Sequence, residues 1–256
     1  MSSDRVTEKE VSSSSAEELE EYGELTVERK VEKHFGNVNL VIFRVDHSKY
    51  GYQRFENGSL TVEKVIASDR ALELGIVPIA PLNLPTKYGS HLMLRLRTPL
   101  VLDPKLHVDA YLTMPVEVGV VRANRDDAQI IDAFSVGQPK YALYGTPEMG
   151  IICRYYETRI NPEIPKIAPH EEAVVRVHFH NQTDKINTIN RIVFPIEGAD
   201  FFYRKNEAYY SDLEVNVEES VFQTIITMDV ANAEWVGSKT NLKQKFEGKY
   251  VMEWGF

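Results

Sequence analysis

The chain has 256 residues, of which 43% are hydrophobic and 26% are charged, and its net charge is −9. This length is enough for one large β domain or two smaller ones, and the composition excludes a largely disordered chain. Acidic side chains outnumber basic ones, and the sequence contains no cluster of Lys and Arg that would bind a phosphate backbone. We therefore expect no nucleic-acid partner. The single cysteine, Cys153, excludes an intramolecular disulfide and fits a cytoplasmic location.

Residues 1–21 form a stretch that is rich in Ser and Glu. The stretch lacks the basic and apolar regions of a signal peptide, and no later run approaches the roughly 20 apolar residues that cross a bilayer. It also cannot bury enough apolar surface to offset the entropy of ordering. We therefore expect a disordered acidic tail on a cytoplasmic protein that does not insert into membranes.

Alternation of apolar and polar residues with period two dominates after the tail and predicts an all-β protein. Asn57 and Gly58 predict a tight hairpin turn, whereas Pro78, Pro81 and Pro85 predict an extended connection or an edge segment. Residues 22–160 are expected to form an N-terminal β-sandwich-like domain. Its predicted strands lie at 38–45, 50–55, 59–66, 92–97, 107–113, 116–122, 129–136 and 151–157.

Residues 161–169 contain three prolines and no alternation, which predicts a semi-rigid linker. Beyond this linker, residues 170–256 are expected to form a second, smaller β-sandwich-like domain. Its predicted strands lie at 173–180, 187–196, 199–204, 212–217, 221–227 and 249–254.

The segment from Gly137 to Glu157 is the strongest candidate for a functional surface, because it combines four Tyr, three Gly, two Pro and the cysteine. Tyrosine offers an apolar face with a polar tip, which suits interfaces and sugar platforms, and cationic side chains add further contacts. We expect this segment to bind a protein partner or a second copy of the chain. The alternatives are a small molecule or a glycan bound by the same side chains, or tyrosines that only pack at a corner between sheets. The predicted binding residues are Lys140, Tyr141, Tyr144, Arg154 and Tyr156.

Motifs for nucleotide, hydrolase, zinc-protease and redox chemistry do not occur in the sequence, so we assign no catalytic residue and expect no cofactor. Alternation over 151–156 predicts that Cys153 packs as a small buried residue. An enzyme with a nonstandard site near Cys153 remains an alternative, with a positive environment from Arg154. Carboxylates that would pair for acid–base work are Glu117, Asp132, Glu148 and Glu157.

His178 and His180 share one face of a predicted strand, which is a spacing that can hold zinc. Arg176 lies on the same face and would oppose a cation. We therefore predict no metal site, with His178 and His180 as the weak candidates.

Three blocks of the sequence resemble an uncharacterised archaeal family, domain of unknown function four-three-two. The blocks are MPVEVGVV, DAFSVGQPKYALYGTPEMGIICRYYE and KYVMEWG, and the stretch from Pro78 to Pro85 also fits. The resemblance spans most of residues 36–255 and implies an archaeal origin and a β-rich fold. It also implies an accessory role at a membrane protein, because such proteins are encoded near mechanosensitive channel genes. It brings no activity, cofactor or catalytic residue.

Overall fold

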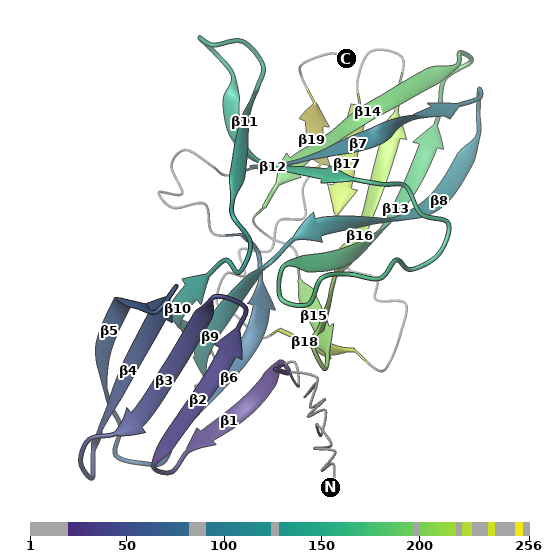
Figure 1. Ribbon diagram of the computed structural model, residues 1–256. Helices are drawn as coiled ribbons and strands as arrows, with labels where there is room; N and C mark the ends of the chain where they lie inside the picture. Colours follow the sequence, from purple (N-terminus) through teal and green to yellow (C-terminus); the bar gives the residue numbers. More distant parts are fainter. Residues whose placement is uncertain are drawn as a thin grey trace, which may run out of the picture.

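The computed structural model describes residues 20–81, 91–123, 128–196, 200–218, 222–226, 235–238 and 249–252. These residues form strands and no helix, so the predicted all-β class is confirmed. The strands group into four sheets, which make two sandwich-like units (Figure 1). In the described parts of the chain, no helix is long and apolar enough to cross a membrane.

The first unit pairs two antiparallel four-stranded sheets with the orders β1-β6-β9-β10 and β2-β3-β4-β5. Inward-facing side chains such as Leu40 and Ile42 on one sheet and Leu74 and Ile76 on the other belong to one buried cluster. This burial follows from the alternation of each strand, which directs every second residue to the core. The strands are β1 (Gly23–Val27), β2 (Lys30–Phe35), β3 (Val38–Arg44), β4 (Lys49–Glu56), β5 (Ser59–Ala67), β6 (Leu72–Ile79), β9 (Glu117–Ala123) and β10 (Ala128–Phe134).

The second unit holds a sheet of order β11-β12-β7-β14 and a larger sheet of order β18-β15-β16-β13-β8, in which β17 also pairs with β16 and β19 with β17. Two pairs, β7 with β12 and β13 with β16, are parallel and the others are antiparallel. The strands are β7 (His91–Leu102), β8 (His107–Pro115), β11 (Lys140–Tyr144), β12 (Ile151–Thr158), β13 (Glu172–Asn181), β14 (Asn187–Pro195), β15 (Phe201–Arg204), β16 (Glu207–Val217), β17 (Phe222–Ile226), β18 (Val236–Gly237) and β19 (Lys249–Met252).

The chain passes between the two units more than once. Strands β7 and β8 belong to the second unit, β9 and β10 return to the first, and β11 begins the second unit again. Strand β8 pairs with β13 and β7 pairs with β14, so strands from both sides of residues 161–169 share sheets. The predicted boundary at 161–169 therefore does not separate the sheets. Alternation locates strands, but it carries no signal for which distant strands pair.

Strand β6 corrects the interpretation of the proline-rich stretch. It lies inside its sheet between β1 and β9, and Pro78 is paired with Val118. The pairing of β1 with β6 ends at Gly23 and Ile76, so at Pro78 only one neighbouring strand is present. A missing backbone N–H costs little at such a position. Pro81 follows the strand, and Pro85 lies outside the described residues.

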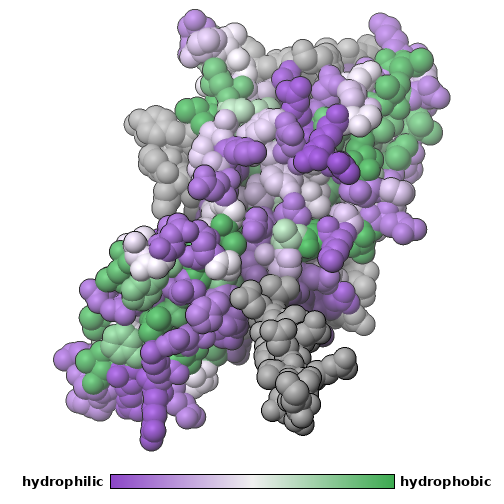
Figure 2. All heavy atoms as spheres, viewed as in Figure 1, coloured by the Kyte–Doolittle hydropathy of each residue, from purple (hydrophilic) through white to green (hydrophobic). Residues whose placement is uncertain are grey.

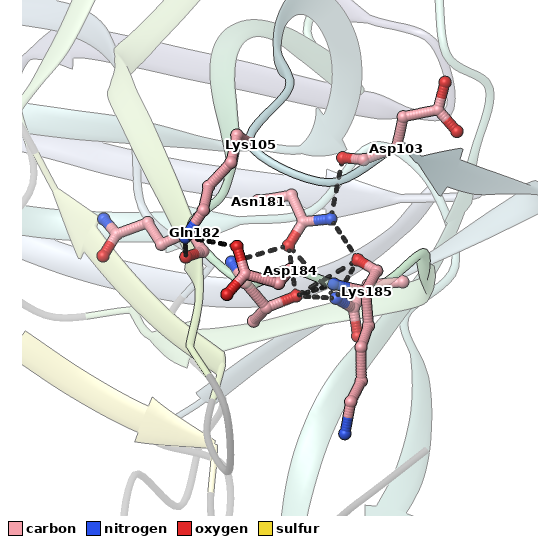
Figure 3. A network of polar contacts seen from close by, with 8 residues as sticks. Asp103, Lys105, Asn181, Gln182, Asp184 and Lys185 are labelled. Carbon is pink, nitrogen blue, oxygen red and sulfur yellow. Dashed lines mark hydrogen bonds and ion pairs between the residues drawn. The ribbon is translucent and has the colours of Figure 1, made fainter.

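The connection between β13 and β14 is held by the buried side chain of Asn181 (Figure 3). Its amide nitrogen donates hydrogen bonds to the backbone carbonyls of Leu102, Asp103 and Lys185, at 3.2, 2.8 and 2.8 Å. Its carbonyl oxygen accepts from the backbone and the hydroxyl of Thr183. One amide thus joins both turns at this end of the second unit.

The two units also meet around the buried imidazole of His170, which precedes β13. Its ring contacts Tyr22 and Phe35 edge-on, each with a centroid distance of 4.9 Å. Residue 22 was predicted to begin the folded part, and it is indeed buried. Of the predicted disordered tail, residues 1–19 lie outside the described residues, whereas Glu20 forms an ion pair with Lys33.

Candidate functional site

The segment 137–157 forms a hairpin of β11 and β12 that projects from the second unit (Figure 1). Strand β11 is the edge strand of its sheet. Residues 137–150, which lie outside the predicted strands, include this strand and a turn closed by a hydrogen bond from the Gly150 amide to the Thr146 carbonyl at 2.6 Å. Gly145 takes a φ of 105° in this turn, which disfavours any other residue.

One face of the hairpin exposes large apolar side chains. Tyr141, Leu143 and Ile152 are 48%, 46% and 43% exposed. Leu143 lies directly opposite Ile152, and Tyr141 lies opposite Arg154, so the four side chains share one face. Figure 2 shows hydrophobic residues along this projection below a more polar tip. We call Tyr141, Leu143 and Ile152 the apolar face of the hairpin.

The other face of the hairpin is turned into the protein. Tyr144 is only 2% exposed, and the Arg191 guanidinium lies 5.3 Å from the centre of its ring. Cys153 is fully buried, and burial raises the pKa of its thiol to about 12. Tyr144, a predicted binding residue, is thus not available at the surface, whereas the predicted packing of Cys153 agrees with its burial.

A pocket of about 240 Å³ opens at the base of the hairpin. Its walls come from the points where the chain passes between the units, namely Pro115 and Val116 between β8 and β9, and residues 135–138 between β10 and β11. Strand β12, the residues at the start of β13, Arg97 of β7 and Lys140 of β11 complete it. The lining residues are Arg97, Pro115, Val116, Ser135, Gly137, Gln138, Lys140, Arg154, Tyr155, Tyr156, Glu157, Glu171 and Glu172.

Arg154 is the most buried charged group of the pocket, with 4% of its surface exposed. Its guanidinium donates a hydrogen bond to the Ser135 hydroxyl at 3.4 Å and lies 5.7 Å from the ring centre of Tyr141. The Ser135 hydroxyl in turn donates to the buried carboxylate of Glu117 at 2.8 Å. A chain of polar groups thus links β12 with β9 through the crossing segment.

Two tyrosine–carboxylate pairs also line the pocket. The Tyr156 hydroxyl hydrogen-bonds to Glu172, whose other oxygen accepts from the Ala168 amide at 2.9 Å. The Tyr155 hydroxyl donates to Glu157 at 2.6 Å. Burial first, and then the hydrogen bond to Glu172, raise the pKa of Tyr156, so its hydroxyl stays protonated at neutral pH.

The hairpin and the pocket both lie inside the region that a family model matches. This model is described as "Protein of unknown function (DUF432)", and it matches residues 21–250. The chain belongs to the DUF432 family. No curated protein and no solved structure matches it. Because the function of the DUF432 family is unknown, membership assigns no chemistry to the hairpin or the pocket.

Three of the predicted binding residues of this DUF432 protein meet in the pocket, namely Lys140, Arg154 and Tyr156. Tyr141 lies beside Arg154 on the apolar face, and Tyr144 lies apart in the interior. Sequence reasoning missed Arg97, Ser135, Glu171 and Glu172, because strands far apart in sequence bring them to the pocket. The signal that was available for Ser135 is its place at the start of the Gly/Pro-containing segment.

The four candidate carboxylates do not converge on one site. Glu117 binds Ser135 and Glu157 binds Tyr155. Asp132 accepts a hydrogen bond from the Tyr52 hydroxyl at 2.7 Å and pairs with Arg54 inside the first unit. Glu148 is exposed in the hairpin turn. None of these contacts joins two of them for acid–base work.

The candidate metal ligands are engaged with other side chains. His178 lies between two carboxylates, with Nδ1 at 2.8 Å from Asp109 and Nε2 at 3.5 Å from Asp212. The His180 ring packs against His107 at a centroid distance of 4.8 Å. Within the described ranges, no group of three or more His, Cys, Asp or Glu is arranged to hold a metal ion. Arg176 pairs with Asp109 on the same face.

Proposed function

We propose that the chain is a non-enzymatic interaction module that contacts a protein partner through the β11–β12 hairpin. The observation that carries this proposal is the apolar face of the hairpin, where Tyr141, Leu143 and Ile152 lie side by side on a projecting element. Burying a large apolar side chain contributes about 1.5–3 kcal/mol, so three adjacent ones supply a substantial driving force for association. The proposal keeps the cytoplasmic location expected from the sequence.

The position of β11 at the edge of its sheet gives the partner a second kind of contact. An edge strand presents backbone N–H and C=O groups on its outer side, to which a strand of another chain can be added. A partner strand placed there would lie next to Tyr141 and Leu143. Hydrogen bonds would supply affinity and the two side chains specificity.

The environment of Cys153 supports a non-enzymatic role. A thiol with a pKa of about 12 is almost fully protonated at neutral pH, and only the thiolate is a good nucleophile. The Arg154 side chain lies on the opposite face of β12 and therefore does not stabilise a thiolate. Both observations favour the interaction module over the alternative of an enzyme with a nonstandard site near Cys153.

A pull-down from cells of the source organism tests this proposal, together with the mass of the purified protein. Lysine is tolerated at exposed strand positions, so Leu143→Lys should leave the fold intact while it places a charge on the apolar face. We expect this variant to lose captured partners or self-association while it stays folded. The control is Val65→Lys, on a more exposed strand position of the first unit. Equal capture and equal mass for wild type and Leu143→Lys would contradict the proposal.

A further inference from the structure

The Arg154 guanidinium carries a buried charge that forms no direct ion pair with a carboxylate among the described residues. Its contacts are the neutral Ser135 hydroxyl and the Tyr141 ring. Guanidinium has five N–H donors, and the contact with Ser135 uses one of them. A buried charge without a direct ion pair is costly, so the unused donors of Arg154 would gain from an incoming anion.

The carboxylates near Arg154 form no direct ion pair with it among the described residues, and the buried Glu117 is linked to it only through the Ser135 hydroxyl. Glu172 binds the Tyr156 hydroxyl and the Ala168 amide, and Glu157 binds the Tyr155 hydroxyl. Lys140 and Arg97 are exposed in the pocket lining and add two further cations. The remaining N–H donors of Arg154 are therefore available to a ligand.

Glu171 also lines the pocket, and its carboxylate lies against Gly137, where an added Cβ would come within 2.9 Å of Oε2. Among the described residues, none forms a hydrogen bond or an ion pair with the Glu171 carboxylate. A carboxylate at this place repels a ligand with two negative charges more strongly than one with a single charge, and it attracts an ammonium group.

We propose that this pocket is a binding site for a small molecule with a carboxylate group, which pairs with the Arg154 guanidinium. The planar fork of guanidinium matches carboxylate geometry, and its hydrogen bonds to a charged acceptor are stronger than neutral ones. The volume of about 240 Å³ lies below the roughly 300–1,000 Å³ of pockets for drug-sized ligands, which limits the ligand to a small metabolite. The three glutamates disfavour the dianionic phosphate group.

The place of the pocket in the fold supports the proposal. Its walls are the segments that cross between the two units, and ligand pockets occur preferentially at such junctions. Arg154 lies beside Tyr141 of the apolar face, but Tyr141, Leu143 and Ile152 do not line the pocket, so the pocket can be tested separately from the proposed protein contact. It also gives a concrete location to the small-molecule alternative that the sequence raised.

Nuclear magnetic resonance titration of the full chain tests this site, with the Arg154 side-chain Nε–H signal as the reporter. The probes are acetate, alanine, inorganic phosphate and glucose. We expect acetate and alanine to shift the Arg154 signal in a saturable manner. Alanine should bind more tightly than acetate if its ammonium group contacts Glu171. Saturable binding of phosphate or glucose that is tighter than that of both carboxylates, or no saturable shift with either carboxylate, would overturn the proposal.

Variants connect the response to the pocket. Lys140→Gln, at the exposed rim, should weaken carboxylate binding about two- to fivefold. Arg154→Lys keeps the charge but loses the fork, and should weaken it about tenfold or more. The control is Lys185→Gln, because the Lys185 ammonium group points away from its surroundings (Figure 3) and should leave binding unchanged.

Because Arg154 is buried, Arg154→Lys is compared with wild type by its amide spectrum before titration. If Arg154→Lys is unfolded, the carboxylate affinity of Lys140→Gln tests the proposal, and it is measured from the shift of the Tyr156 amide signal. Unchanged affinity in Lys140→Gln would then contradict the assignment of the pocket.

Discussion

The Arg154 guanidinium donates a hydrogen bond to the Ser135 hydroxyl at 3.4 Å and so joins β12 to the segment by which the chain leaves the first unit. Ser135 also donates to Glu117 at 2.8 Å, which places one small side chain between a buried cation and a buried anion. The contact ties the frame of the pocket to the core of the first unit.

Replacing Ser135 with alanine should lower the free energy of unfolding. The change removes a hydrogen bond to a charged acceptor and leaves the Glu117 carboxylate without that donor, a loss of about 1–3 kcal/mol. Urea denaturation followed by tyrosine and tryptophan fluorescence measures it. Ser59→Ala, at an exposed position of β5, should stay within about 0.5 kcal/mol of wild type. A loss of the same small size in both variants would mean that the link through Ser135 contributes nothing.

The Cys153 thiol should resist alkylation in the folded protein. Burial keeps iodoacetamide away and holds the pKa at about 12, so the thiolate fraction at pH 7–8 is very small. Intact mass after treatment should show one added group in urea and none in buffer. Rapid labelling of Cys153 in the folded protein would contradict this prediction and would support a reactive site near Cys153.

The buried His170 should make stability fall as the pH drops from about 6.5 to about 4. Burial lowers the pKa of its imidazole to about 4, whereas an unfolded histidine titrates near 6.5. Between these values the unfolded chain binds a proton that the folded chain does not. The contribution of His170 is therefore complete above pH 6.5 and is lost by pH 4, on the order of 3 kcal/mol.

Denaturation at a series of pH values measures this effect by comparison with His170→Asn. Asparagine tolerates the φ of 64° at this position but has no titrating ring. The variant should be less stable at neutral pH and should show a flatter pH dependence over this window. His47→Asn is the control, because the His47 side chain is 91% exposed. A wild-type slope in His170→Asn would show that other groups cause the pH dependence.

Asn181→Asp should destabilise the protein more than most single changes. The carboxylate has nearly the shape of the amide, but it cannot donate to the carbonyls of Leu102, Asp103 and Lys185. It also places a charge in a buried position. We expect a loss of at least about 3 kcal/mol in urea denaturation. Asn190→Asp makes the same chemical change at an exposed position of β14 and should be nearly neutral; similar losses in both would refute the role of the network.

The strand positions could be predicted from the sequence where alternation was clear. Asn57 does take positive φ, with 51°, in the predicted turn between β4 and β5, and β13 and β14 begin within one residue of their predicted positions. Strands β1, β2, β6, β11 and β18 were not predicted. Lys and Glu occupy half of β2, prolines obscured the end of β6, and Gly and Pro flank β11. Which strands pair was not predictable, because Pro115 and Val116 join two units without any break in the pattern.

The site was predictable only in part for the same reason. Lys140, Arg154 and Tyr156 come from one unusual segment, and composition alone singled it out. Glu172 reaches the pocket from a neighbouring strand, so only the fold shows that it pairs with Tyr156. The burial of Tyr144 depends on Arg191 of β14, a contact that no local pattern indicates.

Site-specific photo-crosslinking from position 143 is the most direct measurement of the proposed protein contact. A photoreactive amino acid replaces Leu143 in the full chain, expressed in cells of the source organism, and Val65 carries the same group as the control. We predict one discrete crosslinked product from position 143 and none from position 65. A product of twice the chain mass would identify a second copy, and a membrane protein in the product would identify an accessory role. The same weak, heterogeneous products from both positions, or none from position 143, would contradict the proposal that the hairpin docks a protein partner.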